Sequence, residues 1–295
     1  MSTHRRPRRP VLHGLAERIG ELQALDGPAE ALAKAVRRAV PAGPVKDVLS
    51  GTWLGHPLHP VLTDLPIGTW TSALLLDVLG GRAGRRGADR LVALGLLTAT
   101  PTAVTGLTEW ADTTVVDQTV RRVGAVHAVA NVGALALFGA SLAARRGERR
   151  GSGVLLALAG AGALTAGGHL GGHMTYAQGV GIDRTAFEAE PDEWQPTVAE
   201  SELAEGALHR AVVDGHDVLL VRSGGSIHAL AGRCTHRGGP LADGQPVDGC
   251  IQCPWHGSRF ALEDGSVERG PAAFPQPLYD TRVREGRVEI RRAQP

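Results

Sequence analysis

The stretch Cys234-Thr-His236, followed sixteen residues later by Cys253-Pro-Trp-His256, decides the fold of the C-terminal part of this chain. The pattern fixes four residue types and two short spacings, so a chance match is rare. Each Cys-His pair is followed by glycine, at Gly238-Gly239 and at Gly257. Two glycine-flanked loops that each offer a thiol and an imidazole predict a site folded around a small inorganic centre.

Two kinds of metal centre use this donor set. In a Rieske [2Fe–2S] centre, two thiolates bind one iron and two imidazoles bind the other. A tetrahedral Cys2His2 zinc ion is the alternative. The first pair is separated by a single residue, which is shorter than zinc-finger spacing. We therefore predict that Cys234, His236, Cys253 and His256 hold a [2Fe–2S] cluster, with zinc as the alternative.

Composition limits the remaining possibilities. The 295 residues allow two domains of ordinary size. The net charge of +1 and the aromatic content of 4% give no sign of a nucleic-acid partner. Of the three cysteines, only Cys250 lies outside the metal pattern, so no disulfide framework is predicted. This cysteine usage fits a reducing compartment.

Long apolar segments occupy the middle of the chain. They run over residues 61–79, 91–108, 123–144 and from about 153 to 182. A span needs about 20 apolar residues to cross a bilayer. We expect an all-α four-helix transmembrane bundle at residues 51–182, with membrane lipid as a partner. A buried soluble bundle is the alternative, because alanine and glycine make these segments only moderately hydrophobic.

The segments on either side of the apolar region have their own patterns. Apolar residues recur at helical spacing within residues 1–50, which predicts an amphipathic arm lying on the protein or on the membrane surface. Residues 183–196 are acidic and contain two prolines, which predicts a linker that gives the next domain some reach. Residues 197–295 are expected to form an all-β domain, with strands over 218–221, 226–230 and 287–290.

Histidines gather on one side of the expected bundle. With four spans, the starts of the first and third and the ends of the second and fourth share one face. That face receives His56, His59, His127, His169 and His173. Ionisable groups at membrane depth are usually functional, so we considered haem b between His127 and His169 or His173, a quinone or proton site, and a bare metal site. Histidines that bond to backbone at helix ends are the alternative. The prolines after His56 and His59 predict a rigid turn rather than helix.

Two resemblances extend this prediction. Gly55-His-Pro-Leu-His-Pro60 and Asp64-Leu-Pro-Ile-Gly68 resemble the signature of a bacterial four-helix membrane family without an established function. This resemblance implies a multi-pass protein of the bacterial cytoplasmic membrane. The C-terminal hundred residues resemble Rieske-type ferredoxins, the electron carriers of aromatic-ring dioxygenases. In that comparison, Gly270-Pro271 matches the proline loop that covers the cluster.

Departures from the respiratory Rieske pattern predict a low reduction potential. Respiratory members have a disulfide between positions that hold Gly239 and Trp255 here, and a tyrosine where this chain has Phe260. Ser258 remains and could donate to a cluster sulfur. The resemblance surrounds the cluster with Gly238, Trp255, Gly257, Ser258 and Pro271. Fewer donors stabilise the reduced cluster less, which predicts a potential in the lower part of the Rieske range of about −150 to +300 mV.

These observations favour a membrane-anchored electron-transfer protein over a stand-alone catalyst. Its partner would be a cofactor in the membrane domain or an unidentified donor or acceptor protein. A redox sensor or structural module is one alternative, and a ferredoxin component of an oxygenase system is another. The sequence lacks a second His/His/carboxylate group for mononuclear iron, which argues against an oxygenase. Arginine-rich loops after the first and third spans suggest that these loops are cytosolic. Cluster assembly and the absence of a disulfide instead suggest a cytosolic Rieske domain, which we expect.

Overall fold

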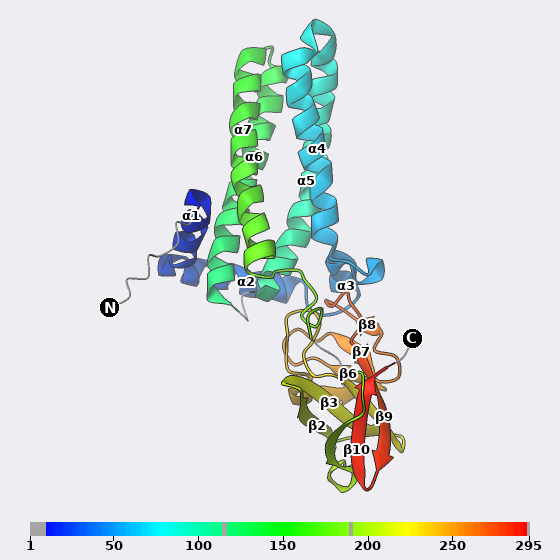
Figure 1. The fold of residues 1–295 in the computed structure, drawn as a ribbon. Helices are drawn as coiled ribbons and strands as arrows, with labels where there is room; N and C mark the ends of the chain where they lie inside the picture. The colour runs from blue at the N-terminus through cyan, green and yellow to red at the C-terminus, as the bar shows by residue number, and fades with distance from the viewer. Residues whose placement is uncertain (1–9, 114–116, 189–190, 294–295) are drawn as a thin grey trace, which may run out of the picture. The chain divides into compact units, whose positions relative to one another are not determined.

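The computed structural model describes residues 10–113, 117–188 and 191–293 (Figure 1). The chain divides into two compact units. The first is helical and comprises Met1–Ala39 and His59–Val180. The second comprises Val40–Leu58 and Gly181–Pro295. The predicted order, an N-terminal helical region followed by a C-terminal β domain, is therefore confirmed.

Four long helices occupy the four predicted apolar segments of the helical unit. They are α4 (Leu58–Leu79), α5 (Gly81–Thr113), α6 (Gln118–Arg146) and α7 (Arg150–Gly172), and a π-helical turn at His173–Ala177 extends α7. Among the described residues, three helices are long and apolar enough to cross a membrane: residues 81–113, 118–146 and 150–177. Helix α4, which contains Asp64 and Asp77, does not meet this criterion, so a bundle of four spans is not established.

The prediction of a non-helical turn over residues 56–60 is wrong for His59 and Pro60. Helix α4 begins at Leu58, so His59 and Pro60 lie in its first turn. Proline is tolerated there because the first N–H groups of a helix have no partner within it.

Close helix packing depends on an aromatic pair and on small residues. The Trp70 ring of α4 stacks on Phe138 of α6 with centroids 4.1 Å apart, and the Trp70 indole N–H donates to the Val92 carbonyl of α5 at 3.3 Å. A Cβ at Gly160 of α7 would lie 3.0 Å from the Phe138 ring, and one at Gly167 would lie 2.7 Å from the Asn131 amide. These glycines let α6 and α7 approach closely, as predicted for helices in lipid.

A network of ion pairs joins the four helices α4, α5, α6 and α7. Arg145 of α6 donates to Asp77 of α4 at 2.9 Å and to Asp89 of α5 at 3.0 Å. Arg150 of α7 donates to Asp77 at 2.6 Å. The side chains of Asp77 and Arg145 are fully buried. The sequence predicted Arg145 in the arginine-rich loop after the third span, whereas in the structure it lies in α6 and bonds to α4 and α5.

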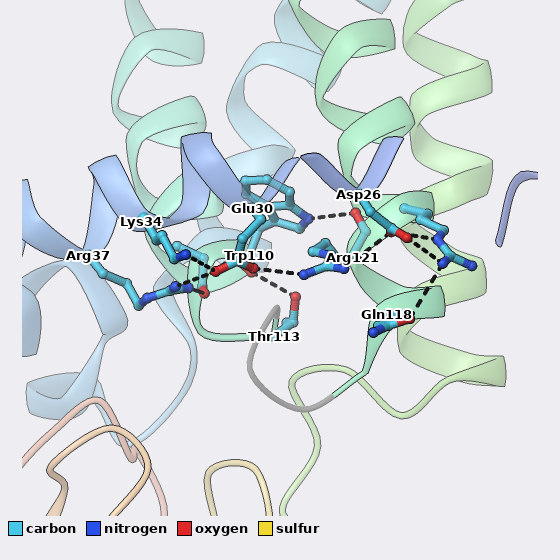
Figure 2. Close-up of polar contacts among 10 residues, drawn as sticks. Asp26, Glu30, Lys34, Arg37, Trp110, Thr113, Gln118 and Arg121 are labelled. Atoms are coloured by element: carbon cyan, nitrogen blue, oxygen red, sulfur yellow. Dashed lines mark hydrogen bonds and ion pairs between the residues drawn. The ribbon is translucent and has the colours of Figure 1, made fainter. Parts of the chain in front are cut away.

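The N-terminal helices are bound to the helical unit and do not form a free arm. They are α1 (Val11–Gly20) and α2 (Asp26–Ala39). Figure 2 shows the contacts of α2: Asp26 accepts from Arg122 at 2.7 Å, and Glu30 accepts from Arg121 at 2.7 Å. Arg37 donates to the Ala111 carbonyl at 2.6 Å. Ala16, Ala29 and Ala33 are buried against the other helices, whereas Leu15, Leu22 and Leu32 remain about half exposed.

Two sheets form the second unit. The larger has the strand order β1-β10-β9-β4-β3-β2 and the smaller has the order β5-β6-β7-β8. The strands are β1 (Gln195–Ala199), β2 (Leu208–Val213), β3 (His216–Ser223), β4 (Ser226–Ala231), β5 (Gln245–Val247), β6 (Cys250–Gln252), β7 (Arg259–Ala261), β8 (Val267–Arg269), β9 (Leu278–Arg284) and β10 (Arg287–Arg292). Neighbouring strands pair antiparallel throughout. The three predicted strands are confirmed within β3, β4 and β10.

The predicted linker and arm boundary differ from the structure. Within residues 183–196, the Arg184 N–H donates to the Thr235 carbonyl at 3.0 Å, and Trp194 stacks with Arg282 at 4.2 Å. The described residues of this segment therefore contact the β domain. Residues 40–58, which include the short helix α3 (Pro44–Ser50), also belong to this unit and not to the predicted arm and membrane domain.

Candidate metal centre

The two Cys-His motifs fold into two similar loops, one after β4 and one between β6 and β7. In the first loop, the Cys234 N–H donates to the Gly239 carbonyl and the Gly238 N–H donates back to the Cys234 carbonyl, both at 2.8 Å. In the second, the Cys253 N–H donates to the Ser258 carbonyl at 2.8 Å, and the Gly257 N–H donates back to the Cys253 carbonyl at 3.1 Å. The same pair of backbone hydrogen bonds therefore holds each cysteine in its loop.

Glycine is required at one position in each loop. Gly238 and Gly257 have φ angles of +79° and +77°, which side chains with a Cβ rarely adopt. This explains why a glycine follows each Cys-His pair at the same distance from its cysteine.

The structure brings the four predicted ligands together. Cys234 and Cys253 are buried, and their sulfurs share a hydrogen bond. The His236 and His256 rings lie with centroids 5.0 Å apart and nearly perpendicular, at 87°. Among the described residues, no three His, Cys, Asp or Glu side chains converge on a single ion. The four donors lie as a sulfur pair and an imidazole pair, which is how a two-iron Rieske centre divides its ligands.

The protonation chemistry of these side chains suits metal binding. A hydrogen bond from the Cys234 thiol lowers the pKa of Cys253 to about 7. The same contact, together with burial, raises the pKa of Cys234 well above its ordinary value. Burial lowers the pKa of His236 well below its ordinary value, so its imidazole is neutral at pH 7. Thiolate and neutral imidazole are the forms that bind metals.

The space around the sulfurs also fits a cluster. A Cβ at Gly239 would lie 2.7 Å from the Cys253 sulfur and 3.2 Å from the Trp255 ring. Glycine therefore keeps the volume beside the sulfur open, where a respiratory Rieske protein is expected to have cysteine. Trp255 is 39% exposed and its ring meets that of His256 at a centroid distance of 6.4 Å. The residues present thus fit a two-iron cluster with two sulfur and two nitrogen ligands.

Ser258 and Pro271 lie where the loop after β8 meets the second cysteine loop. The resemblance to Rieske ferredoxins predicted both residues beside the cluster. Ser258 is fully buried, and its hydroxyl oxygen accepts from the Ala272 N–H at 3.0 Å. Pro271, which precedes Ala272, is buried as well. This bond ties the loop after β8 to the second cysteine loop.

Two residues that support the cysteine loops were missed by sequence analysis. The buried Gln276 amide donates to the carbonyls of Ala231 and Arg233 at 2.8 and 2.7 Å, which fixes the approach to Cys234. Arg269 donates to the Gly257 carbonyl at 2.6 Å. Neither residue belongs to a short motif, so the sequence carried no signal for its role.

The predicted histidine pair in the helical unit is not formed. The His127 ring donates to the Gly167 carbonyl at 2.7 Å, and a Cβ at Gly171 would lie 3.1 Å from this ring. Residues 167 and 171 share one face of α7, whereas His169 and His173 lie on another face because each is two positions further along. The prediction that His127 faces one of them is wrong, and neither haem b nor quinone is supported.

The remaining histidines mostly contact neighbouring helices. His173 meets the His13 ring of α1 at a centroid distance of 5.2 Å, and His169 lies 3.4 Å from the Leu12 carbonyl. His59 of α4 donates to the Thr102 carbonyl of α5 at 2.9 Å. His56 is exposed. Most of these side chains therefore join helices through backbone carbonyls or ring contacts.

Family comparisons agree with this division of the chain. Residues 193–280 match the Rieske [2Fe-2S] domain, and residues 55–184 match a family described as a predicted membrane protein (DUF2231). The chain thus joins a domain of this membrane-protein family to a Rieske [2Fe–2S] domain. Both predicted resemblances are confirmed at the level of the domain.

Known relatives match the Rieske part. Apoptosis-inducing factor 3 of Mus musculus is 32% identical over 90 residues, which are 30% of this chain and 15% of the relative. The anthranilate 1,2-dioxygenase ferredoxin subunit of Burkholderia cepacia is 29% identical over 103 residues, 35% of this chain and 95% of the subunit. The cytochrome b6-f complex iron-sulfur subunit 2 of a Nostoc strain is 37% identical over 101 residues, 32% of this chain and 56% of that subunit. The Rieske domain and these relatives support an electron-transfer role.

Proposed function

We propose that this protein is a membrane-anchored carrier of single electrons, with a Rieske [2Fe–2S] cluster held by Cys234, Cys253, His236 and His256. One observation supports this most strongly: two loops with the same pair of backbone hydrogen bonds present a pair of sulfurs and a pair of imidazoles. When bound, the cluster supplies a one-electron couple. The chain lowers the pKa of the Cys253 thiol, keeps the His236 imidazole neutral and limits access of water to the sulfurs.

The proposed partner is a separate redox protein. The matched ferredoxin subunit belongs by its name to a dioxygenase, which supports a donor or acceptor outside the chain. The helical unit is proposed to act as the anchor, because three of its helices are long and apolar enough to span lipid. The histidines of that unit are assigned to helix packing.

The proposed potential lies in the lower part of the Rieske range. Phe260 is fully buried and contributes no hydroxyl, while Gly239 and Trp255 exclude a loop disulfide. Ser258 is then the main side-chain donor left beside Cys253. Potentiometric titration followed by electron paramagnetic resonance (EPR) measures this property, and a midpoint near the upper limit of about +300 mV would contradict it.

The proposal puts the Rieske domain in the cytosol. Arginine occurs at both ends of α6, since Arg121 and Arg122 lie in its first turns while Arg145 and Arg146 end it. The arginine bias that suggested the opposite orientation is therefore weaker than the loops alone indicated. Protease treatment of sealed cells and of inverted membrane vesicles tests the orientation. Cleavage within residues 197–295 in inverted vesicles alone is expected, and cleavage in intact cells would refute it.

The ligand assignment is tested with matched cysteine variants. Cys253→Ser is expected to abolish the Rieske EPR signal and to lower the content of iron and acid-labile sulfide. Cys250→Ser is the control, because Cys250 is also buried and its thiol lies near the Asp248 carbonyl, away from the two loops. A full signal in Cys253→Ser, or zinc without sulfide in the wild-type protein, would overturn the proposed function.

A further inference from the structure

A segment that lies in the sequence between the two parts of the helical unit is bonded to the loop that follows β8. The Gly270 N–H donates to the Asp47 carboxylate of α3 at 2.9 Å. The Thr52 hydroxyl donates to the Ala272 carbonyl at 3.0 Å. These partners are separated by 223 and 220 residues in the chain. Residues 44–54, which we name the N-terminal clamp, are thus an integral part of the second unit.

The clamp and the loop fit closely. A Cβ at Gly270 would overlap the Thr52 hydroxyl and would lie 2.9 Å from the Asp47 carboxylate. Just before the clamp, Ala42 lies 3.4 Å from where a Cβ of Gly257 would be. The backbone of Gly270 therefore contacts the clamp, and the backbone of Gly257 contacts Ala42 just before it. These contacts leave the Gly270–Ala272 loop little freedom to move.

The Gly270–Ala272 loop is bonded in turn to the second cysteine loop. The Ala272 N–H donates to the Ser258 hydroxyl oxygen at 3.0 Å, and the Ser258 carbonyl accepts from the Cys253 N–H at 2.8 Å. Because the Ser258 oxygen already accepts a bond from Ala272, its own O–H proton must point elsewhere. Thr52 and Ser258 thus hold the carbonyl and the N–H of the same residue, Ala272.

We infer that Thr52 and Asp47 are positioning residues for the metal centre: they fix the Gly270–Ala272 loop and, through it, the direction of the Ser258 hydroxyl in the second cysteine loop. This inference rests on the proposed function. Hydrogen bonds to the sulfurs stabilise the reduced, more negative cluster and so raise its reduction potential. The clamp therefore helps to set the potential from a position far away in the sequence.

The experiment compares variants of the full chain, prepared anaerobically in detergent and titrated potentiometrically with EPR detection. Thr52→Val removes the hydroxyl and keeps the side-chain shape, and a lower midpoint potential is expected. Thr52→Ser restores a hydroxyl and is expected to return the potential to the wild-type value. Thr197→Val is the matched control, because the Thr197 hydroxyl donates to the Val288 carbonyl at 2.8 Å in the same unit.

A second pair of variants separates the hydrogen bond of Asp47 from its charge. In Asp47→Asn the amide oxygen can still accept from Gly270, while the negative charge is removed. Asp47→Ala removes the same charge and the acceptor as well, so its midpoint potential is expected to lie below that of Asp47→Asn. This pair also tests the inference if Thr52→Val assembles no cluster.

The outcomes separate the two proposals. Absence of a Rieske signal from the wild-type protein refutes the proposed function and this inference with it. A wild-type signal together with equal midpoints for wild type, Thr52→Val and Thr197→Val, and equal midpoints for Asp47→Asn and Asp47→Ala, refutes the inference alone. A lower midpoint in Thr52→Val than in wild type, and in Asp47→Ala than in Asp47→Asn, with no shift in Thr197→Val, supports it.

Discussion

The His127 ring on α6 donates a 2.7 Å hydrogen bond to the backbone carbonyl of Gly167 on α7. Asn131 lies one turn further along α6, and its amide donates to the His127 carbonyl at 2.8 Å within the same helix. Glycine at 167 makes this approach possible, because a Cβ there would lie 2.7 Å from Asn131. The pair therefore joins two helices and gives His127 a structural role.

His127→Ala is expected to weaken the helical unit by about 0.6–1.7 kcal/mol, the range for hydrogen bonds between membrane helices. Thermal unfolding in detergent measures this change. His56→Ala is the control, because His56 is exposed. The Rieske EPR signal is expected to be unchanged in both variants. Loss of that signal in His127→Ala would contradict the structural role.

The buried pair of Asp77 and Arg145 predicts a larger effect. Removing one partner of a buried ion pair leaves an uncompensated charge and costs about 3–5 kcal/mol. Asp77→Asn is therefore expected to lower the unfolding temperature markedly. Asp64→Asn is the control on the same helix, because Asp64 is exposed. Equal unfolding temperatures for the two variants would show that the network contributes little.

Attachment of the N-terminal helices to α6 is expected to weaken at low pH. Hydrogen bonds, chiefly from Arg122, lower the pKa of Asp26 from 3.8 to about 2. A carboxylate with a depressed pKa stabilises the folded state above its ordinary pKa, and this contribution is lost as the pH falls towards 2. Asp26→Asn lacks the charge at every pH.

Hydrogen–deuterium exchange over residues 11–39 measures this attachment. At pH 5, Asp26→Asn is expected to exchange faster than the wild-type protein, and the difference is expected to vanish near pH 2. Glu21→Gln is the control, since Glu21 is an exposed carboxylate just after α1. A difference between wild type and Asp26→Asn that persists at the lowest pH would exclude titration of Asp26 as its cause.

Local patterns in the sequence predicted the parts of the fold that are themselves local. The apolar runs gave all four long helices, and the Cys-His motifs gave the two metal-binding loops. Helical spacing of apolar residues also predicted the two N-terminal helices. Their contacts were not predictable, because Asp26 meets Arg122 across 96 residues and no periodicity connects them.

The metal centre shows the same limit. Glycines with positive φ were identified because each follows its motif at a fixed distance. The clamp was missed because Thr52 and Ala272 are 220 residues apart and neither has a distinctive neighbour. The prediction that His127 faces His169 or His173 failed for a geometric reason. The order of the helices predicts which end of the bundle a residue occupies, but it does not predict which face of one helix packs against the next.

Gly239 offers a direct test of the space beside the sulfurs. In Gly239→Ala, the new methyl group would lie 2.7 Å from the Cys253 sulfur, closer than real Cβ atoms approach. Either the sulfur or the first loop must shift, so iron and acid-labile sulfide per chain are expected to fall several-fold. Gly133→Ala is the control, because nothing lies within 4 Å of the added methyl group on α6. Full cluster content in Gly239→Ala would mean that the loop can move without loss of its ligands, and that the open volume beside Cys253 is not a requirement of the centre.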